Sequence, residues 1–252
     1  TNCSTDAVAK GPLGMLWFDD LGFPMPSRHG RGHAPLLLEG RLLVEGLDGL
    51  LCVSAYNGRK LWEYPLPGIL AAFHGDHLMG TSGTTSNFCV TRGGLYVAVG
   101  EKCLRIDPAT GKLLATFPAP AREDGKPGTW GYLACEGDTL FGSLADTTHI
   151  VTYRYRPGGD MRTQFTESKL LFAVDAKTGK LRWRYKPEQS IRHNAIAVGG
   201  GRVYLIDRAI AVGDRKKERR GASAPPAEHP TGTLVALDAA AGRVVWDSDK
   251  DI

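Results

Sequence analysis

The nine residues DAKTGKLRW at positions 175–183 recur along the chain with small changes. Similar stretches are SAYNGRKLW at 54–62, DPATGKLLA at 107–115 and DAAAGRVVW at 238–246. The glycines of the four copies, Gly58, Gly111, Gly179 and Gly242, lie 53, 68 and 63 residues apart. A repeat of this length indicates one supersecondary unit per period, and the unequal spacings indicate loop insertions.

Each copy ends a series of apolar segments in the same order: a segment A, a glycine turn, a strand B, a connector and a strand C that runs into the motif and strand D. This order predicts a four-stranded antiparallel meander, and meanders repeated at this size pack radially as blades of a β-propeller. We therefore expect an all-β protein, because no helical pattern of the kind that a parallel βαβ fold needs lies between the strands. The expected blades cover about 33–65, 86–118, 130–186 and 193–249 of a single segment 1–252, with insertions at 145–169 and 208–232.

The stretch MLWFDD at 15–20 predicts a lone outer strand of a preceding blade. Sixteen strands and one further strand do not close neatly into a ring. We therefore expect an incomplete ring that is completed by missing blades or by a second copy of the chain, because an open sheet edge favours aggregation.

The recurring motif has a structural explanation. An aspartate at the end of strand C can accept backbone N–H groups within the turn, and a glycine supplies the positive φ that a tight turn needs. A tryptophan four residues later can cover the neighbouring blade and donate its N–H to a backbone acceptor. The predicted docking residues, besides the four glycines, are Asp107, Asp175, Asp238, Trp62, Trp183 and Trp246. Ser54 replaces the aspartate in the first copy and Ala115 the tryptophan in the second, which a packing repeat tolerates and a catalytic motif would not.

Composition is that of an ordinary globular chain of 252 residues with a net charge of +4, 23% charged and 42% hydrophobic residues. No apolar run approaches the roughly 20 residues of a membrane span, and the first residues lack the layout of a signal peptide. Residues 208–230 contribute +3 of the net charge, in a run whose composition favours a solvated loop over contact with nucleic acid. The five cysteines form no C-x-x-C pair, and their odd number leaves at least one free thiol.

The stretches AVDAKTGKLRW at 173–183 and ALDAAAGRVVW at 236–246 resemble the tryptophan-docking motif of pyrroloquinoline-quinone-like (PQQ-like) propeller repeats. The resemblance covers residues 13–249, and LWFDDLG, SRHGRGHAP and LCVSAYNGRKLWE are most similar to multidomain, planctomycete-type members. The family includes quinone-dependent alcohol dehydrogenases and an outer-membrane assembly scaffold lipoprotein. The resemblance implies a propeller of seven or eight blades. It also implies an exported protein, for example one of the periplasm.

The quinone enzymes of the family use an adjacent Cys-Cys pair, a Trp under the quinone, Ca²⁺ held by Glu and Asn, and an Asp base. This sequence has no Cys-Cys dipeptide, and four of its five tryptophans occupy docking positions. We therefore expect a non-catalytic scaffold or binding segment with no confident cofactor. A part of a quinoprotein alcohol dehydrogenase, with PQQ and calcium, is the alternative.

Binding is predicted on one face of the propeller. In a meander the A–B and C–D turns share one face, and in this chain these turns are short. Both long B–C insertions and the long D–A segments therefore lie on the other face, where binding sites are usually found. Aligning the A–B glycines places His33, Ser86, Trp130 and Asn194 in one column at the entry to strand A. The candidate site for a protein partner or a small polar or anionic ligand is Arg28, His29, Arg31, His33, Trp130, Arg192, His193 and Asn194. Solvated loop residues are the competing interpretation.

Neither RHGRGHA (28–34) nor FHGDH (73–77) supplies a third ligand at a fixed spacing, so no metal site is predicted. The sequence contains no G-x-S-x-G, H-E-x-x-H or P-loop motif.

Overall fold

The computed structural model describes residues 15, 17–18, 22–26, 32–74, 84–148, 165–210 and 231–248. These residues form four antiparallel meanders, which confirms the predicted all-β architecture. The first blade contains β1 (Leu36–Leu38), β2 (Arg41–Glu45), β3 (Gly49–Ser54) and β4 (Lys60–Pro65), and the second contains β5 (Phe88–Thr91), β6 (Gly94–Val99), β7 (Lys102–Ile106) and β8 (Leu113–Pro118).

The third and fourth blades belong to one nine-stranded sheet. The third contains β9 (Trp130–Glu136), β10 (Thr139–Ala145), β11 (Glu167–Asp175) and β12 (Leu181–Tyr185), and the fourth contains β14 (Ala197–Gly199), β15 (Arg202–Arg208), β16 (Gly232–Asp238) and β17 (Val244–Asp247). The short strand β13 (Ile191–Arg192) joins them, because it pairs with Glu167 and Ser168 of β11 and with Asp207 of β15.

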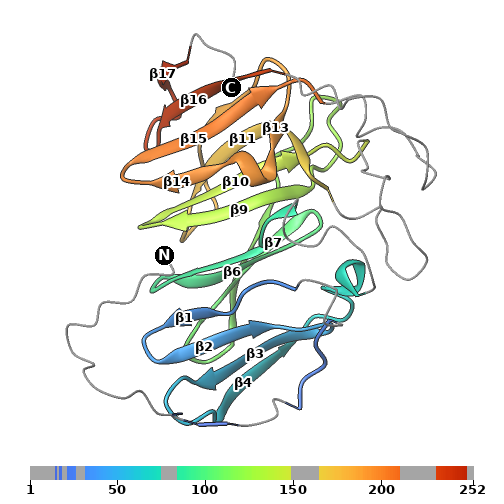
Figure 1. Cartoon of the computed structure of the whole chain (residues 1–252), viewed down its shortest axis with the longest axis vertical. Coiled ribbons are helices and arrows are strands. Elements are labelled where there is room, and N and C mark those ends of the chain that lie inside the picture. Colours follow the sequence, from blue (N-terminus) through green and yellow to red (C-terminus); the bar gives the residue numbers. More distant parts are fainter. Residues whose placement is uncertain are drawn as a thin grey trace.

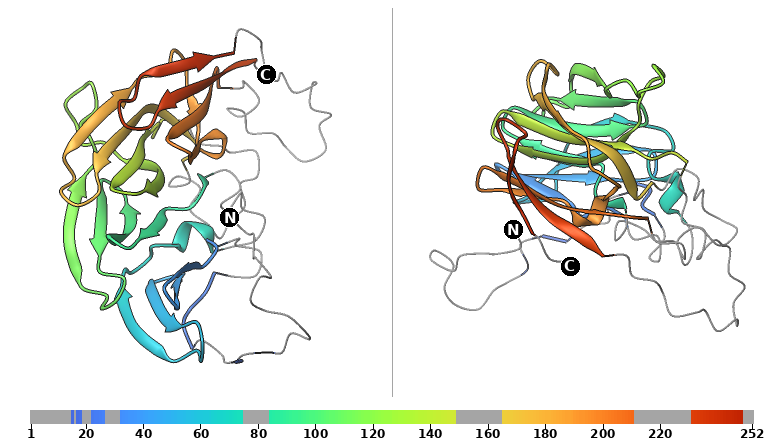
Figure 2. Two further views of the ribbon diagram at one scale, coloured as in Figure 1. Left: turned by 90° about the vertical axis from the view of Figure 1, so that its left-hand side faces the viewer. Right: turned by 90° about the horizontal axis from the view of Figure 1, so that it is seen from above.

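The blades follow one another along an arc that does not close (Figures 1 and 2). Between them lie two described 3₁₀ turns, η1 (Ala71–Phe73) and η3 (His193–Ala195). No described helix has the length and apolarity needed to cross a bilayer.

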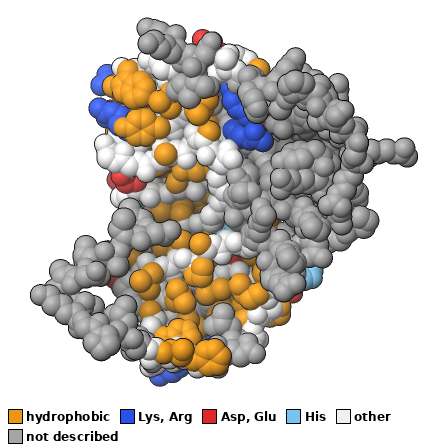
Figure 3. All heavy atoms as spheres, in the orientation of Figure 1, with side chains coloured by type: hydrophobic (Ala, Val, Ile, Leu, Met, Phe, Trp, Pro, Cys, Tyr) orange, Lys and Arg blue, Asp and Glu red, His pale blue; other side chains and the backbone are white. Residues whose placement is uncertain are grey.

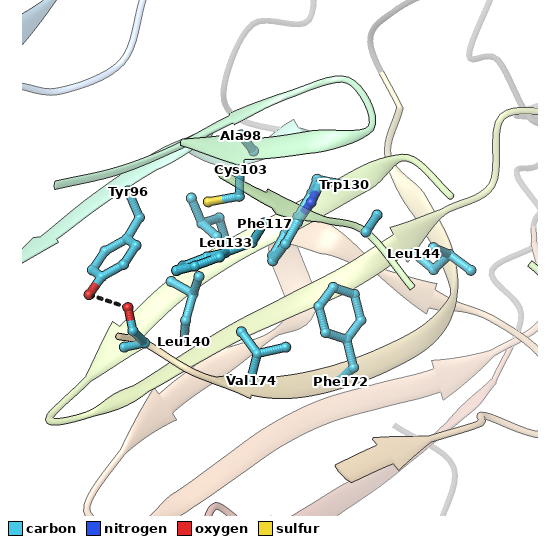
Figure 4. Close-up of a cluster of buried hydrophobic side chains, with 12 residues drawn as sticks. Tyr96, Ala98, Cys103, Phe117, Trp130, Leu133, Leu140, Leu144, Phe172 and Val174 are labelled. Atoms are coloured by element: carbon cyan, nitrogen blue, oxygen red, sulfur yellow. Dashed lines mark hydrogen bonds between the residues drawn. The ribbon is translucent and has the colours of Figure 1, made fainter. Parts of the chain in front are cut away.

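The hydrophobic core lies between neighbouring blades. One cluster joins Trp62 of β4 to Phe88 and Leu95 of the second blade, and another joins Trp183 of β12 to Val203 and Leu237 of the fourth. The cluster between the second and third blades contains Phe117, Trp130 and Phe172 and is shown in Figure 4. Each blade therefore depends on its neighbour to bury its apolar face.

Two blade junctions share one docking geometry. Trp62 Nε1 donates to the carbonyl of Pro108 at 3.0 Å, and Trp183 Nε1 donates to that of Ala239 at 2.9 Å. Each ring covers the glycine of the next C–D turn: a Cβ added to Gly242, whose φ is +69°, would lie 2.4 Å from the ring of Trp183. Only glycine combines that φ with so close a ring.

Trp17 makes the same contact on the first blade, since its Nε1 donates to the carbonyl of Ala55 at 2.8 Å and its ring covers Gly58. The described residues of the predicted lone strand, Met15, Trp17 and Phe18, are nevertheless not in a strand. The described part of the chain offers this segment no neighbouring strand to complete its backbone hydrogen bonds.

At the junction between the second and third blades, where the motif has Ala115 instead of tryptophan, two residues supply the covering ring and the hydrogen-bond donor. Phe117, two residues beyond Ala115 and thus on the same face of β8, covers Gly179, whose added Cβ would lie 2.3 Å from the ring. The hydroxyl of Tyr96 on β6 donates to the carbonyl of Ala176 at 2.9 Å (Figure 4). The ring and the donor are therefore both present, on different strands.

The aspartates of the motif stabilise the C–D turns through hydrogen bonds. Asp175 Oδ1 accepts the N–H of Thr178 at 2.8 Å, and Arg182 donates to Asp175 Oδ2 at 2.9 Å. These hydrogen bonds, led by that from Arg182, keep the pKa of Asp175 far below its ordinary value. Backbone N–H groups, led by Ala109 for Asp107 and Ala241 for Asp238, lower the pKa of those two carboxyls as well.

Trp246 differs from the other docking tryptophans because no blade follows it within the described residues. Its side chain is 44% exposed, beside Val244 at 48% and Val245 at 45%. Exposed hydrophobic side chains are visible over β16 and β17 in Figure 3. The last blade therefore presents an open edge.

Replacing Trp183 by Phe is expected to lower the free energy of unfolding by about 2 kcal/mol, because the buried Ala239 carbonyl loses its donor and the ring its contact area. The matched Trp246→Phe change, at an exposed ring, is expected to cost less than about 0.5 kcal/mol. Urea unfolding measures both, and equal losses would contradict the docking role of Trp183.

Replacing Phe117 by Ala is expected to lower the free energy of unfolding by about 3–5 kcal/mol, since a buried ring that covers Gly179 is removed. Leu114→Ala on the same strand, at a side chain 49% exposed, is the control and is expected to cost less than about 0.5 kcal/mol. If urea unfolding shows Phe117→Ala to be as mild as the control, Phe117 does not replace the tryptophan.

Candidate functional site

A cavity of about 640 Å³ lies where the ends of several blades meet. It is lined by the D–A connection that follows the first blade (Leu66–Gly68, Ile69, Ala71–Phe73, Thr84, Thr85 and Asn87), by Ala98–Gly100 at the B–C turn of the second blade, and by Thr129–Gly131 at the start of β9. His33, Phe165 and His193 complete the lining. The cavity thus opens among B–C and D–A connections, on the face opposite the docking turns.

The structure brings three of the predicted site residues, His33, Trp130 and His193, to this cavity. Two others do not line it: Asn194 is exposed, and Arg192 places its Nε 3.6 Å from a carboxylate oxygen of the buried Glu167. Arg28, His29 and Arg31 lie outside the described residues. The cavity therefore shares only part of the predicted set.

His33 is held by a buried carboxylate. Its side chain is fully buried, and its Nδ1 lies 2.5 Å from Glu45 Oε2 at the end of β2. Asn87 Nδ2 donates to the other oxygen, Glu45 Oε1, at 2.9 Å, and Phe73 packs edge-on against the imidazole with ring centroids 5.1 Å apart. Both oxygens of Glu45 are thus occupied, and the imidazole is fixed with Nδ1 toward the protein.

His193 belongs to a second buried network. Its Nε2 lies 2.7 Å from Ser168 Oγ, which donates to Ser143 Oγ at 2.7 Å, and Ser143 Oγ accepts the N–H of Tyr132 at 2.7 Å. Burial lowers the pKa of His193 to about 4, although nearby backbone groups led by Thr84 oppose the shift. His193 is therefore neutral near pH 7.

Trp130 forms the third polar position. It is 5% exposed, its ring lies over Gly142, and Phe172 meets it edge-on with centroids 4.9 Å apart (Figure 4). Its Nε1 has no hydrogen-bond partner among the described residues, and the same holds for His33 Nε2, Asn87 Oδ1 and His193 Nδ1. Buried polar atoms are nearly always hydrogen-bonded in folded proteins, so four such atoms on residues that line one cavity set this part of the structure apart from the rest of the core.

The chemistry of this arrangement favours binding. Ser168 is fully buried and does not line the cavity, which separates the Ser168–His193 pair from a substrate placed there. Burial raises the pKa of Cys52 to about 11 and keeps the pKa of Cys89 and Cys103 well above the ordinary value, so these are thiols rather than nucleophilic thiolates. No set of three metal-ligating side chains occurs within the described ranges.

Sequence reasoning missed Glu45, Asn87 and Ser168. A signal exists for Glu45, because a carboxylate closes the otherwise apolar strand LLVE and is fully buried. Aligning the A–B glycines selects Ser86 at the entry to the second blade. The residue that lines the cavity is its neighbour Asn87, one position later. Ser168 carries no such signal.

The pH dependence of stability tests the burial of neutral His193. Because its pKa falls from 6.5 to about 4 on folding, the unfolded chain binds the proton more readily, and stability is lost as the pH falls through this window. We expect the free energy of unfolding to drop by about 3 kcal/mol between pH 6.5 and pH 4 on this account. His193→Asn removes the titrating group and is expected to flatten this part of the urea-unfolding profile. Identical slopes for both proteins would contradict the assignment.

The chain matches one family model of known proteins. The PQQ_2 family model, described as outer membrane protein assembly factor BamB, matches residues 102–251, more than half of the chain. A search of the curated proteins gave no match.

Among solved structures, the quinohemoprotein alcohol dehydrogenase ADHIIG from Pseudomonas putida HK5 has a TM-score of 0.52 and 15% identity, and the match covers 94% of this chain and 36% of that one. A europium-containing methanol dehydrogenase has a TM-score of 0.47 and 14% identity, covering 89% and 44%. BamB from Moraxella catarrhalis has a TM-score of 0.45 and 11% identity, covering 86% and 51%. The chain thus spans about half or less of these proteins, and the likeness concerns the fold alone.

Proposed function

The chain belongs to the PQQ_2 family of propeller repeats, and on that premise we propose that it is a non-catalytic scaffold or binding segment that receives a protein partner on its B–C and D–A face. The description of the family as an outer membrane protein assembly factor agrees with such a role. The single observation that carries the proposal is the cavity on this face, which is lined by the B–C and D–A connections of the blades.

The opposite face supports the same division of roles. Its C–D turns are occupied by the blades themselves: the carbonyls of Ala55, Pro108, Ala176 and Ala239 each accept a side-chain donor from Trp or Tyr. The other face is built from the connections that vary most between the blades, and variable connections on a rigid scaffold are the usual place of binding sites.

The exposed hydrophobic side chains at β17 suit a second kind of partner in this proposal. Trp246 has the position of Trp62 and Trp183 in the repeat but is exposed. In this proposal a further blade covers it, supplied either by the remainder of the propeller or by a second copy of the chain.

The alternative, a part of a PQQ-dependent alcohol dehydrogenase, fits the residues poorly. PQQ is an anionic tricarboxylate, and its calcium needs free carboxylate and amide oxygens. No Lys or Arg of the described residues lines the cavity, and both oxygens of Glu45 are already bound to His33 and Asn87. The described lining of the cavity therefore gives no support to a quinone at this place.

Site-directed photo-cross-linking tests the face. A benzophenone amino acid at Val99, a partly exposed residue beside the cavity, is expected to cross-link a partner in the native host, detected by immunoblot and mass spectrometry. The same group at Lys112, exposed on a C–D turn of the same blade, is the matched control. Cross-linking at Lys112 as strong as at Val99, or at Lys112 alone, would reject the proposed face.

The dehydrogenase alternative is tested on the same chain by adding PQQ and Ca²⁺. We expect no bound quinone absorbance and no dye-linked alcohol oxidation. Binding with turnover would replace the scaffold proposal by the enzymatic one.

A further inference from the structure

We propose that Cys89 of β5 and Cys135 of β9 are a redox-active pair, which forms a disulfide bond between the second and third blades under oxidising conditions. The inference goes beyond the proposed function, because it concerns a covalent modification at a blade junction and not a partner on the B–C and D–A face.

The two cysteines lie on neighbouring inner strands. Cα atoms of β5 and β9 come within 8 Å of each other, although the strands belong to different blades. Cys89 is the second residue of β5, and Cys135 is the last but one of β9. A disulfide spans Cα atoms about 4.4–6.8 Å apart, so the approach of these strands is compatible with one.

Side-chain alternation along the strands directs the two thiols toward the same interface. On β5, Phe88 packs in the cluster shared with the first blade, and the next residue, Cys89, packs against the cluster between the second and third blades. On β9, Ala134 packs against the cluster shared with the fourth blade, and the next residue, Cys135, packs against the same cluster as Cys89. Each cysteine therefore points toward the blade of the other.

The two thiols also interact with each other. Burial and, after it, a hydrogen bond with the side chain of Cys135 raise the pKa of Cys89 well above its ordinary value. A third thiol, that of Cys103 on β7, lies in the same cluster (Figure 4). Cys103 is buried, whereas Cys89 and Cys135 are both partly exposed. A small reagent therefore reaches the pair more readily than it reaches Cys103.

The oxidant that the reaction needs is itself a disulfide, such as glutathione disulfide. A thiolate of the pair attacks the oxidant, whose S–S bond breaks to release one thiol and to leave a mixed disulfide. The other cysteine then attacks the mixed disulfide and releases the second thiol. The Cys89–Cys135 bond has formed, the pair has lost two electrons and two protons, and the oxidant has been reduced to two thiols.

The pair lies at the one described blade junction without a docking tryptophan, where Phe117 and Tyr96 supply the ring and the donor. A bond from Cys89 to Cys135 closes a loop that contains β6, β7 and β8. Closing a loop of this kind restricts the unfolded chain and so favours the folded one. The oxidised protein is therefore expected to be the more stable form.

The test begins with the folded 252-residue chain, incubated with glutathione disulfide at pH 8.5, where more of each thiol is ionised. Free thiols are then blocked with N-ethylmaleimide, and the chain is digested with trypsin without reduction. Lys or Arg lies between every two neighbouring cysteines, so each cysteine has its own tryptic peptide. We expect mass spectrometry to find the peptides of Cys89 and Cys135 linked, at least about tenfold more often than any other pair. Blocked thiols at both positions, or a predominant link to another cysteine, would overturn the proposal.

Three variants identify the partners. Cys135→Ala is expected to abolish the link, because Cys89 loses its partner. Cys103→Ala, in the same cluster, and Cys52→Ala, in the cluster between the first and second blades, are the controls and are expected to keep it. A linked Cys89 in Cys135→Ala, or loss of the Cys89–Cys135 link in both controls, would reject the pairing.

Melting temperature shows whether the link joins the blades. We expect the oxidised chain to melt about 5–10 °C above the reduced one, and we expect this difference to vanish in Cys135→Ala. Equal melting temperatures of the linked and reduced chains would contradict a stabilising link. These measurements need no partner, so failure of this inference and failure of the cross-linking from Val99 can be told apart.

Discussion

The structure depends on one contact between neighbouring blades: an aromatic ring that covers a positive-φ glycine, paired with a donor to the carbonyl at the same turn. Each blade has an apolar face that it cannot bury alone, and this contact fixes the distance and angle at which the next blade does so. Glycine is needed at the turn for two reasons at once, its φ and the ring directly above its Cα. The aspartate that precedes it stabilises the turn and leaves the following carbonyl available to the neighbouring blade.

The junction at Gly179 shows which part of this contact is essential. There the ring comes from Phe117 and the donor from Tyr96, so no tryptophan is needed. What persists at every described junction is the physical requirement, a covered glycine and a satisfied carbonyl. This explains why the motif can lose its most recognisable residue without loss of the blade. The motif is accordingly a packing device, and function has to be sought on the face it leaves free.

The sequence predicted the blades well because the motif is local and repeated, so each copy supports the reading of the others. It predicted the cavity only in part. His33 and Trp130 follow from aligning the entries to the inner strands, but η3 turns its successive side chains about 120° apart. Of the predicted residues around it, His193 therefore reaches the cavity while Asn194 is exposed and Arg192 turns toward Glu167. Glu45 acts through His33 and Asn87, a contact between residues far apart in the sequence that no local pattern encodes.

The short strand β13 makes one blade junction different from the others. Through it the third and fourth blades share a continuous ladder of backbone hydrogen bonds, whereas the first two blades are joined to their neighbours mainly by side chains. The third and fourth blades are thus joined by main-chain hydrogen bonds, whereas two places, between the first and second blades and between the second and third, depend mainly on side-chain packing. The cavity is lined by residues from all four blades or their connections and spans both of these places. Because its lining comes from several blades, the shape of the cavity follows from how these blades are placed along the arc.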